Sequence, residues 1–131
     1  MPRKFRLEDL RFNPNPPPIK GGREFHLRAE EAFLKIEDIL SLYAQGRIDF
    51  DYALRALNYA KNAIIPKMPY SEEEKRELLE VYEEAIRVLK RLRTPKAVMK
   101  WLLSHGPPRK SGISLLDFMQ GHKSAPRDPI E

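Results

Sequence analysis

The sequence contains no cysteine, and this absence excludes several classes of protein. Without cysteine there is no disulfide framework, no thiolate nucleophile and no cysteine-ligated zinc site. Long apolar runs are missing too, and no segment approaches the ~20 apolar residues that a membrane-spanning helix needs. The N-terminus, MPRKFRLEDLRF, lacks the apolar stretch of a secretion signal. These absences predict a cytoplasmic protein that makes no membrane contact.

Motifs that hold metals, nucleotides or reacting groups are also missing. None of the three histidines has a second histidine three or four residues away, so we expect no metal ion. Gly21 and Gly22 follow a run of prolines rather than a strand, which argues against a phosphate-binding loop. Glu30 and Glu37 alternate with apolar residues in a helical pattern that predicts a solvent-exposed acidic face. We therefore expect no cofactor, no small-molecule substrate and no enzymatic activity.

Apolar periodicity predicts an all-α fold. Apolar residues recur at three- and four-residue steps, and we see no convincing strand pattern. We expect a small helical bundle: an antiparallel helical hairpin, a long third helix and two short C-terminal helices, forming one domain over residues 24–121. The predicted helices span residues 24–45, about 50–65, 72–93, 94–105 and 114–121.

Local signals mark the ends of these helices. Gly46 stands where a glycine commonly terminates a helix. Asp49 or Asp51 can cap the second helix, and Ser71 begins a capping box at the third. Thr94 followed by proline predicts the start of the fourth helix.

Extended arms are predicted at both ends of the domain. Residues 1–23 include RFNPNPPPIKGG, and its prolines favour polyproline II, so we expect an arm outside the core. The sequence of residues 122–131, HKSAPRDPIE, predicts an irregular C-terminal tail. The N-terminal arm carries apolar side chains that can attach to its own domain or to a partner. We predict a second partner contact at Phe12, Pro16, Pro17, Pro18 and Ile19.

Charge is distributed unevenly along the chain. Residues 1–23 carry six Lys or Arg and two acids, residues 24–84 eight and fourteen, and residues 85–131 ten and three. Residues 85–116 contain no acid at all. The helix dipole explains only the cations of the last helical turn, because its effect fades beyond that turn. An acidic middle with basic ends therefore indicates a charged partner.

Three functions remain compatible with this basic segment. We favour a regulator or adaptor that binds a large protein partner with an acidic surface, such as a component of transcription or other nucleic-acid machinery. A direct, largely non-sequence-specific nucleic-acid-binding protein is the alternative, for example a packaging or nucleoprotein subunit, and a virion or assembly component is a third. The predicted partner-binding residues are Lys90, Arg91, Arg93, Lys96, Lys100, Arg109 and Lys110.

Residues 101–121, WLLSHGPPRKSGISLLDFMQG, carry a short motif. This segment resembles the C-terminal toxin-binding module of the MbcA/ParS/Xre antitoxins. The resemblance lies in the order of its parts: Trp-Leu, a proline-containing loop, a glycine and a leucine-rich helix start. Ser114 stands where that module prefers proline. The resemblance implies a toxin-neutralising or transcription-linked protein. The matching residues are Trp101, Leu102, Pro107, Gly112, Leu115 and Leu116.

Overall fold

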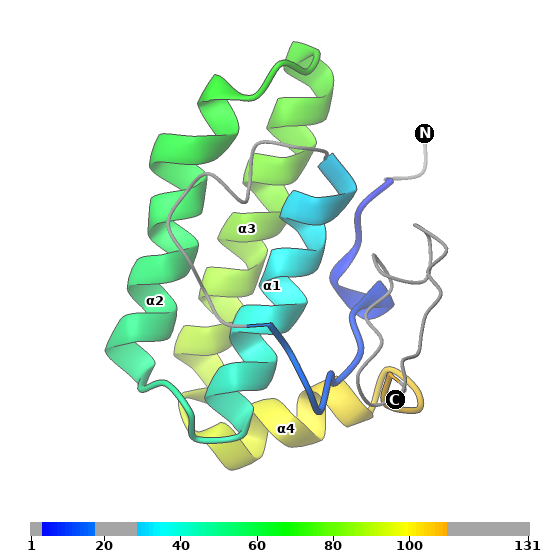
Figure 1. The fold of residues 1–131 in the computed structure, drawn as a ribbon, viewed down its shortest axis with the longest axis vertical. Helices are drawn as coiled ribbons and strands as arrows, with labels where there is room; N and C mark the ends of the chain where they lie inside the picture. The colour runs from blue at the N-terminus through cyan, green and yellow to red at the C-terminus, as the bar shows by residue number, and fades with distance from the viewer. Residues whose placement is uncertain (1–3, 18–28, 110–131) are drawn as a thin grey trace, which may run out of the picture.

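The computed structural model describes residues 4–17 and 29–109, and within these ranges the chain is helical with no strand (Figure 1). This confirms the predicted all-α helical bundle. The predicted fifth helix, the C-terminal tail and Lys110, Pro18 and Ile19 lie outside the described residues. The α-helices are α1 (Ala29–Ala44), α2 (Phe50–Tyr59), α3 (Glu72–Leu92) and α4 (Pro95–Leu103).

α1 is the central helix of the bundle. Apart from Glu30 and Lys35, all of its residues are buried, because α2, α3, α4 and the N-terminal arm pack around it (Figure 1). Gly46 ends the helix with a φ of +75°, as predicted. Its N–H donates to the Tyr43 carbonyl, and the Arg47 N–H donates to the Leu42 carbonyl, both at 2.9 Å. This paired capping pattern turns the chain back, so α1 and α2 form the expected antiparallel hairpin.

Asp49 caps α2, because its carboxylate accepts a hydrogen bond from the Tyr52 N–H at 2.8 Å. The sequence left the choice between Asp49 and Asp51 open. The helical path then changes geometry: a π-helical turn (Ala60–Ile64) and a 3-10 turn (Ile65–Lys67) follow α2 where we expected one continuous helix. Pro66 lies in the last of these turns, since it cannot donate the hydrogen bond that a longer helix requires.

α3 and α4 begin at the predicted caps. The Ser71 hydroxyl accepts from the Glu74 N–H at 3.1 Å, and the Thr94 hydroxyl accepts from the Ala97 N–H at 3.2 Å. α3 runs antiparallel to α2, and α4 lies across one end of the bundle (Figure 1). Val98 and Leu102 are the two buried residues of α4.

The described part of the N-terminal arm, residues 4–17, contributes to the core, and the expectation that the arm lies outside the core was wrong for these residues. Residues 4–17 contain one 3-10 turn, Leu7–Asp9, flanked by the extended residues Arg6 and Leu10, and no other helix. Its apolar side chains fill the face of α1 that the other helices leave open, and the Phe5 and Phe33 ring centroids lie 5.2 Å apart. Because an extended chain has no helical periodicity, the sequence pattern does not identify this burial. The arm's buried apolar residues are Phe5, Leu7, Leu10 and Phe12.

Candidate partner-binding surface

Five predicted binding residues are exposed at the end of α3 and on α4. We call this set the basic end; it consists of Lys90, Arg91, Arg93, Lys96 and Lys100. No member forms an ion pair with any residue in the described ranges. Cations without a counter-charge keep their full attraction for an external anion.

Two further residues extend the basic end, and the sequence interpretation missed both. Arg87 is exposed on α3 one turn before Lys90 and Arg91, so it lies on the same face of the helix. Leu103 is 42% exposed on α4 and follows Lys100 by three residues. Helical spacing alone would have found both positions, because residues three and four apart are neighbours on a helix surface.

The junction between α3 and α4 fixes the direction of the basic end. Arg93 adopts φ +65° and ψ −45°, and the Thr94 N–H donates to the Leu92 carbonyl at 2.7 Å, which is the hydrogen bond of a γ-turn. Such a conformation is strained for a residue other than glycine and persists only where neighbours hold it.

Contacts from the α1–α2 hairpin hold that junction. The Tyr43 hydroxyl donates to the Arg93 carbonyl, and the Arg93 guanidinium lies 4.9 Å from the centroid of the Phe50 ring. Burial raises the pKa of Tyr43, so its hydroxyl keeps the proton that it donates. These contacts therefore hold the α3–α4 junction, and with it the cations of both helices, in one orientation.

Arg109 has a different environment from the basic end. Its Nε lies 2.7 Å from Oε2 of Glu37, and its Nη2 lies 3.0 Å from Oε1. Its backbone N–H donates to the Phe12 carbonyl at 2.9 Å, and its side chain is only 18% exposed. Arg109 thus neutralises a carboxylate within its own chain, in the paired geometry that favours arginine at such sites.

Glu37 is buried, so the expectation that it faces solvent was wrong. The residue is 1% exposed, because the arm and residues 105–109 cover its side of α1. Glu30, on the first turn of α1, is not buried and lies 3.6 Å from the Lys4 ammonium. Helical periodicity predicts a polar face but does not show whether another segment covers it.

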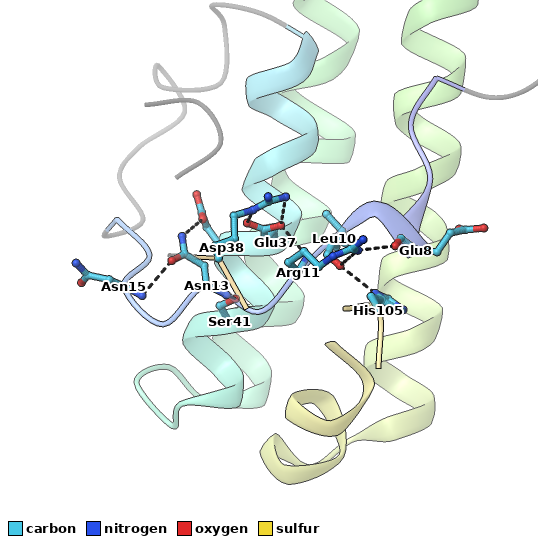
Figure 2. A network of polar contacts seen from close by, with 10 residues as sticks. Glu8, Leu10, Arg11, Asn13, Asn15, Glu37, Asp38, Ser41 and His105 are labelled. Atoms are coloured by element: carbon cyan, nitrogen blue, oxygen red, sulfur yellow. Dashed lines mark hydrogen bonds and ion pairs between the residues drawn. The ribbon is translucent and has the colours of Figure 1, made fainter. Parts of the chain in front are cut away.

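The arm and residues 105–109 pack together over Glu37, Asp38 and Ser41 of α1 (Figure 2). We call this arrangement the clasp. The Arg11 N–H donates to Glu37 Oε1 at 2.8 Å, and the Asn13 N–H donates to Ser41 Oγ at 2.9 Å. Nδ1 of His105 lies 3.1 Å from the Leu10 carbonyl oxygen. The clasp therefore ties the N-terminal arm to the segment that follows α4.

The second-contact residues that we predicted in the arm divide between core and surface. Phe12 is buried in the hydrophobic core, and Pro16 is buried as well. Pro17 is exposed. The side chain of Gln45, just beyond α1, donates to the Pro14 carbonyl at 2.7 Å and holds this part of the arm on the domain. Attachment of the arm to its own domain is thus confirmed, whereas its contact with a partner stays a prediction.

The described ranges contain neither a metal-binding cluster nor a helix that could span a membrane. Across residues 4–17 and 29–109, no cluster of three or more histidine, aspartate or glutamate side chains is arranged to bind a metal ion. None of the helices in these ranges combines the length and apolar character needed to span a bilayer.

Comparisons with known proteins give no relative: no family model matches the sequence, and no curated protein or solved structure is significantly similar to it. The resemblance of residues 101–121 to the antitoxin module stays a prediction from the motif. Within the described part of that motif, Leu102 is buried and Trp101 is half-buried against the core.

Proposed function

We propose that this protein is a non-enzymatic adaptor or regulator that binds an acidic surface of a larger protein through the basic end. The observation that carries the proposal is a group of five exposed cations with no acidic partner in the described ranges. The helix dipoles favour Lys90, Arg91 and Lys100, which lie in the last turns of α3 and α4, but they do not favour Lys96 in the first turn of α4. Within this proposal, the candidate partner is a component of transcription or other nucleic-acid machinery that presents an acidic surface.

The apolar residue beside the cations favours a protein partner. Leu103 is exposed next to Lys100 on α4, and Met99 and Trp101 are only partly buried. Protein interfaces combine an apolar centre with a polar rim, whereas contacts to a phosphate backbone are almost entirely polar. A surface with Leu103 among lysines suits the first kind of partner better.

Direct nucleic-acid binding is the second candidate, supported by the same unpaired cations. Lysine and arginine clusters bind phosphates without reading sequence, and this binding weakens steeply with salt. Titration of duplex and single-stranded oligonucleotides at low salt separates the two candidates. Absence of binding there removes nucleic acid as the direct partner.

Charge reversal on the basic end tests the proposal. We expect the combined variant Lys90→Glu, Arg91→Glu, Lys96→Glu and Lys100→Glu to lose its partner in affinity capture from nuclease-treated lysate of the native host. Its melting temperature should fall only slightly, because these side chains are exposed and unpaired in the described structure and lose only the helix-dipole interaction of Lys90, Arg91 and Lys100.

A matched control carries the same change in net charge elsewhere. The variant Arg47→Glu, Arg55→Glu, Lys67→Glu and Arg76→Glu alters four other exposed cations. We expect it to keep the partner that the wild type captures. Equal capture by both variants, or equal loss in both, would show that the basic end is not the binding surface.

A further inference from the structure

Asp38 is a second carboxyl group under the clasp, beside Glu37 (Figure 2). It is 7% exposed, and Asn13 covers it. The Asn13 side-chain amide lies 3.5 Å from Asp38 Oδ1, at the limit of a hydrogen bond. Glu37 receives both donors of the Arg109 guanidinium that reach the clasp, together with the Arg11 N–H. Of the two adjacent carboxyl groups, Glu37 thus accepts more and shorter hydrogen bonds than Asp38 does.

Charged and titratable groups face Asp38 from several elements. On α1, the charge of Lys35 favours the ionised form of Asp38, whereas the charge of Glu37 disfavours it. Arg109, which follows α4, also favours the ionised form. From α3, Tyr82 donates its hydroxyl proton to the Ala32 carbonyl.

The pKa of Asp38 is raised from 3.8 to about 7, and burial is the largest cause of this net rise. Lys35 opposes this rise, whereas the charge of Glu37 adds to it. The hydrogen bond from Asn13 and the charge of Arg109 lower the pKa again, but less than burial raises it. Burial, with a smaller contribution from Asp38, also raises the pKa of Tyr82, so the tyrosine stays neutral and Asp38 is the group that titrates near neutral pH.

We propose that the clasp is a proton-dependent latch: it holds the arm closed while Asp38 is protonated and loosens when Asp38 becomes ionised. Opening would move Asn13 away and bring Asp38 into water, where its carboxyl group is easily ionised. It would also expose the apolar residues Leu10 and Phe12, which are buried in the closed form. The latch is independent of the function proposed above.

The sign of the effect follows from proton linkage. In the closed form Asp38 has a pKa of about 7, and in the open form it returns towards 3.8. Between these values the closed form holds a proton that the open form has lost. The contribution of Asp38 to clasp stability is therefore fully present below about pH 4 and is lost as the pH rises to about 7. Within this window the opening equilibrium constant rises about tenfold per pH unit.

Amide hydrogen exchange of the full chain, followed by NMR, tests the latch. The reporters are the Arg11 and Asn13 amides, which donate to Glu37 and Ser41. After correction for intrinsic exchange, we expect their protection to fall about tenfold between pH 5.5 and 6.5, and by less from 6.5 to 7.5. Protection that does not change over this range overturns the proposal.

Two variants isolate the role of Asp38. Asp38→Asn mimics the neutral carboxyl group, and we expect its arm amides to show protection independent of pH between 5.5 and 7.5. Asp9→Asn changes an exposed carboxylate of the same arm and should retain the wild-type slope. A slope that survives in Asp38→Asn refutes the latch.

A direct titration keeps the proposal testable if Asp38→Asn does not fold. The carbon-13 chemical shift of the Asp38 carboxyl group in the wild type should titrate near pH 7, and the Arg11 and Asn13 amide signals should change with the same midpoint. A carboxyl midpoint near 4 overturns the proposal, as does an amide midpoint that differs from that of Asp38.

Discussion

The basic end and the clasp use cations of one acid-free segment in opposite ways. Lys100 projects from α4 with no ion-pair partner in the described ranges, whereas Arg109 lies over the buried Glu37 with an Nε–Oε2 distance of 2.7 Å. The two cations look equivalent in the sequence. The difference shows that the role of a charge depends on which segment packs over it. Here the N-terminal arm makes the distinction, because it buries Glu37 and so creates the need for one cation.

The largest expected contrast is between Arg109 and Lys100. Arg109→Ala leaves Glu37 buried without its cation, and we expect a loss of about 3–5 kcal/mol in the free energy of unfolding. Lys100→Ala removes an exposed side chain and should change this free energy by less than about 0.5 kcal/mol. Chemical denaturation of both variants gives the two values. Similar losses would mean that the clasp and the basic end contribute alike to stability.

A leucine pair tests the same contrast through apolar contacts. Leu10 is fully buried in the arm, and Leu10→Ala should cost about 2–5 kcal/mol, because it leaves a cavity against α1. Leu103, beside the basic end, is 42% exposed, so Leu103→Ala should cost much less stability than Leu10→Ala. Thermal unfolding followed by circular dichroism measures both. If Leu10→Ala unfolded no earlier than Leu103→Ala, the arm would not be part of the core.

The smallest expected effect lies at the start of α4. Thr94→Ala removes the side chain that accepts from the Ala97 N–H, and we expect a loss of about 1 kcal/mol. Thr94→Ser keeps a hydroxyl at the cap and should restore most of that stability. The comparison is made by urea denaturation. Equal stabilities of the alanine and serine variants would show that Tyr43 and Phe50 position α4 without help from the cap.

Helix ends were predictable from the sequence because their causes are local. Gly46, Ser71 and Thr94 act on backbone groups within three residues of themselves, so a short stretch of sequence contains the whole interaction. The bundle class follows from apolar periodicity for the same reason. The π-helical turn Ala60–Ile64 was missed, since nothing in its own residues distinguishes it from a regular helix.

The clasp was not predictable, because its partners are distant in the chain. Glu37 pairs with Arg109 across 72 positions, and His105 meets Leu10 across 95. A glutamate between apolar residues is ordinarily exposed, and only a covering segment reverses this. The exposure of Lys90, Arg91, Lys96 and Lys100 was predictable from the sequence, because an acid-free helix surface needs no distant contact to stay exposed.

The long separation of the clasp contacts has a consequence for folding kinetics. The arm is synthesised before α1–α4, yet its contacts with His105 and Arg109 can form only after those residues have been added. Contacts so distant in sequence require closure of a long loop and tend to form late. We therefore expect substitutions in the arm to accelerate unfolding and to leave the folding rate almost unchanged in stopped-flow measurements. The arm would thus reach its native position after helices that are synthesised later.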